Sequence, residues 1–135
     1  MKKLFALLMF LLVLTGCTSI AQPSPAEVQP AYRQVSMNEA IEIMERETNY
    51  IILDVRTPYE FASKRIPGAI NIPNETIGTN EIPQLPDKDQ LILVYCRSGN
   101  RSKQASEKLA ELGYTNIVEF GGINDWPGDT VSQAE

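Results

Sequence analysis

The stretch Leu-Ile-Leu-Val-Tyr-Cys-Arg-Ser-Gly-Asn-Arg-Ser, residues 91–102, joins an unbroken apolar segment to a short polar loop that contains a glycine. A continuous apolar run of this length is typical of a strand buried on both faces of a parallel sheet. From about Arg101 to Leu112 the apolar residues recur at helical spacing, and Gly113 follows as a helix stop. The stretch therefore predicts a strand, a tight loop and a helix in that order, with Cys96 where the strand ends.

Cys96 is the candidate nucleophile of the chain. Backbone N–H groups of the loop and of the helix start are expected to converge near its sulfur, where they stabilise a thiolate and an anionic substrate beside it. The thiolate is the reactive form, and such surroundings bring the pKa of a cysteine below its free value of about 8.5. Because the chain contains no histidine, we expect the loop amides, the helix dipole, Arg97 and Arg101 to activate the sulfur. An inert buried cysteine is the alternative.

The remaining pattern alternates helices with strands, which predicts a single α/β domain with a parallel sheet. Two stretches have the form of a helix-capping box, and the second carries proline at its first helical position. No internal repeat is present. The predicted elements are a helix opened by Ser36-Met37-Asn38-Glu39, a strand at 50–53, a helix opened by Thr57-Pro58-Tyr59-Glu60, a short strand near 69–72 and a last strand at 116–120.

Ligand sites of open α/β sheets lie beyond the carboxyl ends of the strands. The Cys96 loop and the segment Asp54-Val55-Arg56 both follow strands, so we expect them to converge. Asp54 and Arg56 are expected to support neighbouring loops through internal hydrogen bonds, because an unpaired charge there is costly. Ser102 has capping of the helix as an alternative role. Trp126 is expected to pack in the core or at its rim. The candidate substrate-binding residues are Arg97, Ser98, Gly99, Asn100, Arg101 and Ser102.

The loop and three further stretches together resemble the rhodanese family of sulfurtransferases. They occur in a consistent order and with sensible spacing over about residues 32–130, which makes the combination specific. Arg65 is a departure, since many members of the family carry a His at this place. The three further stretches are 53–61 followed by 66–73, 112–114, and 121–126, which ends in Trp126.

This resemblance implies a fold and an activity. The fold is a small doubly wound parallel sheet of about five strands flanked by helices. The activity is sulfur transfer, in which Cys96 takes sulfane sulfur from thiosulfate or a similar donor as a persulfide and passes it to cyanide, a thiol or a protein. No organic cofactor is implied, and one thiol without histidine makes a poor transition-metal site.

Two alternatives to sulfur transfer remain open. Cysteine phosphatases and arsenate reductases that resemble rhodaneses place five residues between the cysteine and the arginine of the loop. Here four residues separate Cys96 from Arg101, and the tighter ring favours a terminal sulfur over a tetrahedral oxyanion. The second alternative is a binding or redox-sensing module without catalysis.

The N-terminus predicts export and lipid attachment. Lys2 and Lys3 precede the apolar run 4–14, which is too short to span a bilayer, so residues 1–16 have the form of a signal peptide. The stretch 14–17 resembles the bacterial lipoprotein processing box, which makes Cys17 the acylated N-terminus. Several acyl chains anchor stably where one does not, so we expect a lipid-anchored protein on the extracytoplasmic face of a cell-envelope membrane. Cleavage after Ala21, which would release the protein, is the alternative.

The rest of the predicted organisation follows from composition. Residues 17–31 hold the lipidated cysteine and a proline-rich tether, 32–130 the domain, and 131–135 a C-terminal tail. The net charge of −5 argues against nucleic acid as a partner. Cys17 and Cys96 are not expected to form a disulfide, because the first is consumed by lipid or lies in a floppy leader, and the second is embedded in the loop.

Overall fold

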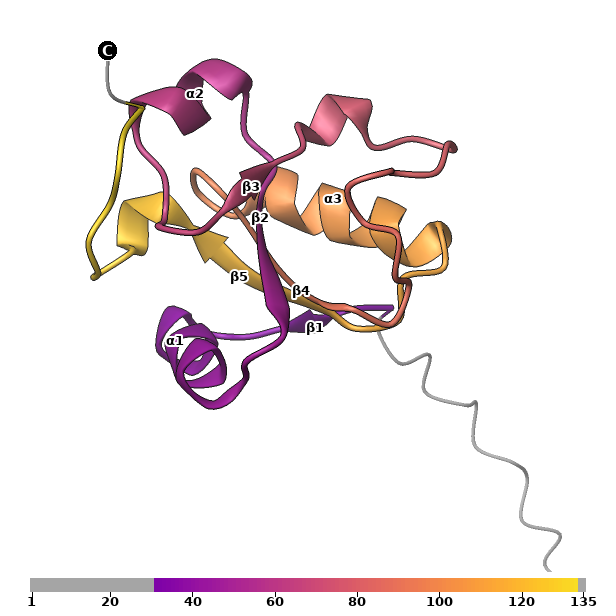
Figure 1. The fold of residues 1–135 in the computed structure, drawn as a ribbon, viewed down its shortest axis with the longest axis horizontal. Coiled ribbons are helices and arrows are strands. Elements are labelled where there is room, and N and C mark those ends of the chain that lie inside the picture. Colours follow the sequence, from indigo (N-terminus) through magenta and orange to yellow (C-terminus); the bar gives the residue numbers. More distant parts are fainter. Residues whose placement is uncertain (1–30, 134–135) are drawn as a thin grey trace, which may run out of the picture.

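The computed structural model describes residues 31–133, and Figure 1 shows their arrangement. The predicted signal peptide, Cys17 and the tether up to residue 30 lie outside the described residues. No helix within 31–133 has the length and apolar character needed to cross a membrane. The elements in chain order are β1 (Arg33–Gln34), α1 (Met37–Arg46), β2 (Tyr50–Asp54), α2 (Pro58–Ser63), β3 (Ile70–Asn71), η1 (Asn74–Thr76), β4 (Leu91–Cys96), α3 (Asn100–Glu111), β5 (Ile117–Gly122) and η2 (Ile123–Asp125).

The strands form one parallel sheet in the order β1-β5-β4-β2-β3. The apolar strands β2 and β4 pair in register from Tyr50 opposite Leu91 to Asp54 opposite Tyr95. The predicted α/β fold with a five-stranded parallel sheet is therefore confirmed. The edge strand β1 was not predicted, because its two residues are exposed and polar and carry no apolar pattern.

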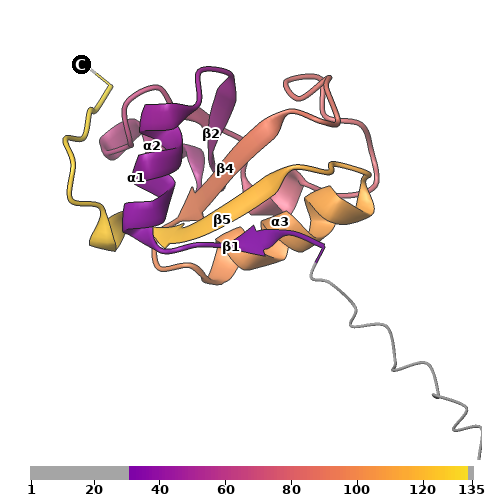
Figure 2. The same cartoon turned by 90° about the horizontal axis from the view of Figure 1, so that it is seen from below.

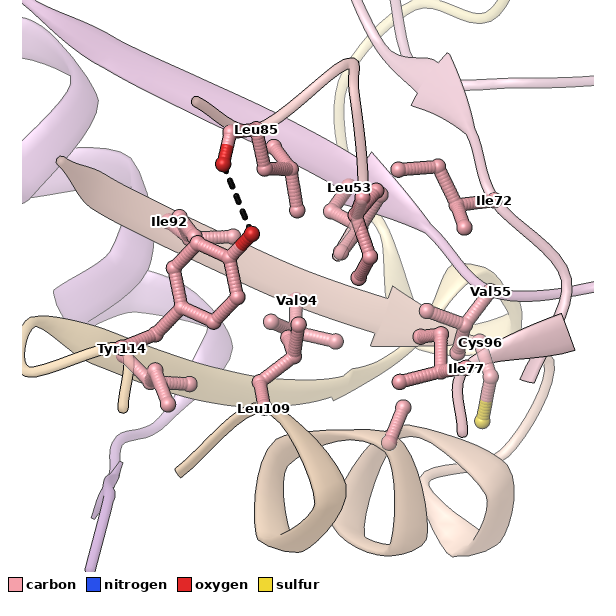
Figure 3. Packing of buried hydrophobic residues seen from close by; sticks show 13 residues of the cluster. Leu53, Val55, Ile72, Ile77, Leu85, Ile92, Val94, Cys96, Leu109 and Tyr114 are labelled. Atoms are coloured by element: carbon pink, nitrogen blue, oxygen red, sulfur yellow. Dashed lines mark hydrogen bonds between the residues drawn. The ribbon is translucent and has the colours of Figure 1, made fainter. Parts of the chain in front are cut away.

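Helices cover both faces of the sheet, as Figures 1 and 2 show, so the fold is doubly wound. On one face α1 buries Ala40 and Ile43 against Leu93 and Phe120. On the other face α3 buries Ala105 and Leu109 against a larger cluster, shown in Figure 3, that includes Cys96. At the far end of that cluster the Tyr114 hydroxyl donates a hydrogen bond to the Leu85 carbonyl at 2.7 Å. Cys96 thus lies in the packed core and at the same time at the carboxyl end of the central strand, β4.

The predicted helix starts are largely confirmed. Thr57 forms a complete capping box with Glu60, and Pro58 is the first residue of α2. Ser36 accepts a hydrogen bond from the Glu39 N–H at 3.2 Å and caps α1. For α3 the alternative role of Ser102 as cap is wrong, because the N-cap is Gly99 and no side chain caps the helix.

Two boundaries differ from the prediction. β5 continues to Gly122 rather than ending at residue 120, because Gly122 still pairs with Cys96. At the C-terminus Val131 pairs with Arg65 through two backbone hydrogen bonds, and the Gln133 N–H donates to the Ala62 carbonyl. The domain therefore extends through Gln133 rather than ending at residue 130. Backbone pairing of this kind leaves no pattern in side-chain types.

Candidate active site

Cys96 is the last residue of β4, where the ladder to β5 becomes irregular between Val94 and Cys96. Only 1% of the residue is exposed. Figure 3 shows its sulfur at the end of the strand, next to the beginning of α3. The Gly99 N–H donates a hydrogen bond to the Sγ atom at 3.0 Å. The predicted order of strand, loop and helix thus places the thiol at the start of a helix, as expected.

Hydrogen bonds in the loop decide the ionisation of this thiol. Burial opposes the thiolate, but the Ser102 hydroxyl and the backbone N–H groups of Ser102, Gly99 and Ser98 outweigh burial and lower the pKa of Cys96. Three of these four donors are backbone groups of the loop and of the first turn of α3. These N–H groups are the donors expected from the sequence to stabilise the thiolate, and activation of the sulfur stays a prediction.

Two glycines make the shape of the loop possible. Gly99 has a φ of 104°, in the left-handed region that other residues rarely adopt. Gly122, on the neighbouring strand, lies directly beneath the loop, and a Cβ atom there would collide with the Arg97 carbonyl. The same carbonyl accepts a hydrogen bond from the Asn124 N–H at 3.2 Å. The end of β5 and the residues that follow it therefore pack directly against the backbone of the cysteine loop.

Arg101 is held by a carboxylate. Its guanidinium donates to both oxygens of Glu60, at 2.8 and 2.9 Å, in a bidentate ion pair that joins α2 to α3. The hydrogen bond from Arg101 is the main cause that lowers the pKa of Glu60 to about 2; burial acts in the opposite direction, and hydrogen bonds from Thr57 lower it further. Arg101, predicted to bind substrate, is therefore a charge already paired within the protein.

The other predicted loop residues divide into exposed and buried groups. Arg97, Ser98 and Asn100 are exposed, whereas Gly99 and Ser102 are buried. Arg97 lines a shallow depression of about 220 Å³ that also includes Tyr59 and Asn124. Tyr59, at the start of α2, is 82% exposed. Arg97 of the loop, which makes no ion pair within residues 31–133, and the exposed Tyr59 of α2 thus line the same depression.

Asp54 and Arg56 support the site from within the fold. The buried Arg56 guanidinium donates to both carboxylate oxygens of Asp54, the shortest contact being 2.6 Å. It also donates to the Lys64 carbonyl at 2.6 Å, and the Asn71 amide donates to the Asp54 and Arg56 carbonyls. The pair makes internal hydrogen bonds, as expected: its guanidinium joins the end of β2 to the residue that follows α2, and Asn71 of β3 binds the backbone of both residues.

Glu119 belongs to the site and was not among the predicted residues. It lies on β5, is only 3% exposed, and its Oε1 accepts hydrogen bonds from the Ser102 hydroxyl at 2.6 Å and from the Gly121 N–H at 2.9 Å. The Ser102 oxygen is in turn 3.5 Å from the Cys96 sulfur. An acidic residue inside the apolar strand 116–120 was the signal in the sequence that could have identified it.

The two remaining predicted positions have packing roles. Trp126 is half-buried, and its ring lies 6.5 Å from that of Phe120, at the rim of the core as expected. Arg65 places its guanidinium over the Phe61 ring at 4.8 Å. Within residues 31–133, no three His, Cys, Asp or Glu side chains gather closely enough to hold a metal ion.

The domain matches the family model described as "Rhodanese-like domain" over residues 36–129. The chain belongs to this family. It is 40% identical over 73 residues to the thiosulfate sulfurtransferase PspE of Escherichia coli, and the alignment covers 54% of this chain and 70% of that protein. It is 40% identical over 79 residues to a sulfurtransferase of Allochromatium vinosum, with 56% of the chain and 70% of that protein covered.

A solved structure shares the fold as well. The structure described as a rhodanese with anions from E. coli superimposes with a TM-score of 0.56 at 36% identity, over 62% of this chain and 98% of that one. Proteins named as sulfurtransferases are therefore among the relatives of this rhodanese-like domain.

The Glu60–Arg101 pair predicts a pH dependence of stability. The pKa of Glu60 falls from 4.5 to about 2 in the folded protein, so the stabilisation is complete above about pH 5 and is lost as the pH falls toward 2. Both side chains are about a quarter exposed, so we expect about 1–3 kcal/mol from the pair. The free energy of unfolding, measured by urea denaturation, should fall less steeply between about pH 5 and about pH 2 in Glu60→Gln than in the wild type.

Glu39→Gln is the matched control, since Glu39 is exposed and makes no ion pair among the described residues. It should retain the wild-type slope of stability against pH. An unchanged slope in Glu60→Gln would contradict the assigned role of the pair.

Proposed function

We propose that this protein is a sulfurtransferase in which Cys96 carries the transferred sulfur as a persulfide. The observation that carries the proposal is the set of N–H groups from Ser98, Gly99 and Ser102 around the buried Cys96 sulfur, which lowers the pKa of that thiol. Membership of a family with sulfurtransferase relatives supports the same chemistry.

The proposed first step loads the cysteine. The Cys96 thiolate attacks the outer sulfur of thiosulfate, the S–S bond of the donor breaks, and sulfite leaves with the electron pair. The terminal sulfur of the new persulfide carries the negative charge. Loop N–H groups that point at one centre stabilise such a charge without having to reorganise.

The proposed second step transfers the terminal sulfur of the persulfide to an acceptor. A thiol, cyanide or a protein thiolate attacks the terminal sulfur, and the Cys96 thiolate leaves. A thiol of lowered pKa is a better leaving group, so the interactions that lower the pKa of Cys96 favour this step too. Both steps reuse one set of loop donors.

Recognition of the donor rests on the backbone more than on arginine charge. Arg101 is neutralised by Glu60, which leaves Arg97 as the exposed arginine of the loop. An anionic donor such as thiosulfate therefore meets Arg97, which has no ion-pair partner in the described part of the chain, and uncharged N–H groups around the sulfur. The short loop, with four residues between Cys96 and Arg101, favours a terminal sulfur over phosphate or arsenate.

We also propose that the domain works on the extracytoplasmic face of a cell-envelope membrane, anchored by acyl chains on Cys17. The basic start, the short apolar run and the stretch 14–17 support this location. The residues between Cys17 and the domain are rich in proline, a composition suited to a spacer.

Replacement of the nucleophile is the first test. Cys96→Ser should abolish transfer from thiosulfate to cyanide, because a hydroxyl oxygen does not carry sulfane sulfur. The purified wild-type chain should gain the mass of one sulfur atom on the peptide that contains Cys96 after incubation with thiosulfate. Rate assays and peptide mass spectrometry measure the two effects.

Cys17→Ser is the matched control for the chemistry and should transfer sulfur at the wild-type rate. Full activity in Cys96→Ser would remove Cys96 from the mechanism. A faster wild-type rate on an aryl phosphate than on thiosulfate would favour a phosphatase, and no sulfur gained from any sulfane donor would favour a binding module.

The location has a separate test. Cys17→Ser in the expressed full-length chain should prevent acylation and move the protein out of the membrane fraction, as measured by fractionation and by the intact mass of the wild type. A wild-type protein without acyl chains, or a variant that stays with the membrane, would contradict the lipid anchor.

A further inference from the structure

The Ser102 hydroxyl lies between two acidic groups. The Cys96 sulfur is 3.5 Å from the Ser102 oxygen on one side, and the Glu119 Oε1 is 2.6 Å from it on the other. The second distance is that of a short O–H···O hydrogen bond. All three side chains are buried, so water does not readily replace any of these contacts.

The remaining neighbours of the Ser102 oxygen are acceptors. The carbonyl oxygens of Gly99 and Gly121 lie 3.0 and 3.3 Å away. If both Cys96 and Glu119 were ionised, two buried anions would compete for the single hydroxyl proton. The oxygen itself would then have no side-chain donor among the contacts described. One additional proton satisfies the cluster, either on the sulfur or on the carboxylate.

From this geometry we infer that Cys96 and Glu119 share one proton through Ser102. In the resting arrangement the Cys96 S–H donates to the Ser102 oxygen, whose O–H donates to Glu119. In the reactive arrangement the S–H bond breaks and a new O–H bond forms on Ser102. At the same time the original Ser102 proton passes to Glu119. A thiolate and a neutral carboxylic acid result, and the net charge of the cluster stays at one negative charge.

This exchange supplies a proton acceptor in a chain without histidine. Two neighbouring anions disfavour each other's ionisation, so moving the proton avoids the second charge. The negative charge then lies on the sulfur, where the Gly99 N–H and the other loop donors hold it. Glu119 is a positioning residue that acts through Ser102. The inference builds on the proposed function only in taking Cys96 as the nucleophile.

Other charged groups face Glu119 and must be controlled. Glu119 lines a cavity of about 400 Å³ together with Glu39 of α1, Lys103 of α3 and Asp125 of η2. On the other side of the cluster Arg101 lies near Cys96 but is paired with Glu60. Among the hydrogen bonds of the described residues, only Glu119 joins its carboxylate to the Ser102 hydroxyl.

The test is the pH dependence of alkylation at Cys96 in the full-length chain, measured with iodoacetamide and read on the Cys96 peptide so that Cys17 does not interfere. With a shared proton, the wild-type rate should level off as the pH falls from about 8 to about 5, because the fraction in the reactive arrangement is constant there. In Glu119→Gln, which keeps an acceptor for Ser102, the rate should continue to fall about tenfold per pH unit.

The control variants show whether a changed pH profile comes from loss of proton sharing, from a change in structure, or from loss of a nearby negative charge. Glu39→Gln and Asp125→Asn should keep the wild-type profile, and Glu119→Asp should restore part of the plateau. Ser102→Ala and the double variant Ser102→Ala/Glu119→Gln should have the same profile, because the connection is already broken in the first. Thermal unfolding checks that each variant is folded.

The inference would be overturned if Cys96 in Glu119→Gln were alkylated at about pH 5 as fast as in the wild type, or faster. That is the result expected if Glu119 acts only as a negative charge that disfavours the thiolate, because its removal would then favour the thiolate. If Glu119→Gln does not fold, the wild-type profile is the test: an alkylation rate that falls about tenfold per pH unit with no plateau also overturns proton sharing. Alkylation requires no sulfur donor, so a failure of sulfur transfer and a failure of proton sharing give different results.

Discussion

The convergence of backbone N–H groups on the Cys96 sulfur is the interaction on which the rest of the site depends. A thiol that is 1% exposed would, from burial alone, resist ionisation. The donors that reverse this effect belong to Ser98, Gly99 and Ser102, all within one loop and the first turn of the helix that follows it. Their positions require Gly99 in the left-handed region and Gly122 beneath the loop, where no side chain fits.

The buried and half-buried ion pairs around the loop join the secondary-structure elements that surround it. The Glu60–Arg101 pair joins α2 to α3, and the Asp54–Arg56 pair joins the end of β2 to its neighbouring segments. Both arginines are thereby committed to carboxylates of the protein. N–H groups and the Ser102 hydroxyl, whose directions are fixed by the fold, donate to the sulfur.

The sequence predicts most of the framework but little of the pairing between distant residues. The apolar run 91–95, Gly99 in the loop and the capping box at Thr57 are local signals, and they led to the correct strand, loop and helix starts, whereas the five-stranded sheet was implied by the family resemblance. The partner of Arg101 lies 41 residues away, and the partner of Ser102 lies 17 residues away. Such contacts depend on which strands become neighbours, and composition and periodicity do not specify them.

Glu119 illustrates the same limit. Its acidic side chain interrupts an apolar strand, which indicates a special environment but not its partner. Only the adjacency of β5 to the start of α3 brings it to the hydroxyl of Ser102. A site that lacks histidine therefore contains a buried acidic group that a search for the usual cysteine–histidine pair does not detect.

The most direct measurement of the central claim is an NMR titration of the backbone amides in the full-length chain. If the amides hold the sulfur, the amide proton shifts of Ser98, Gly99 and Ser102 should move together as Cys96 ionises, and the transition should disappear in Cys96→Ser. Amide shifts in the loop that stay constant while the thiol ionises, or the same transition in Cys96→Ser, would contradict the account.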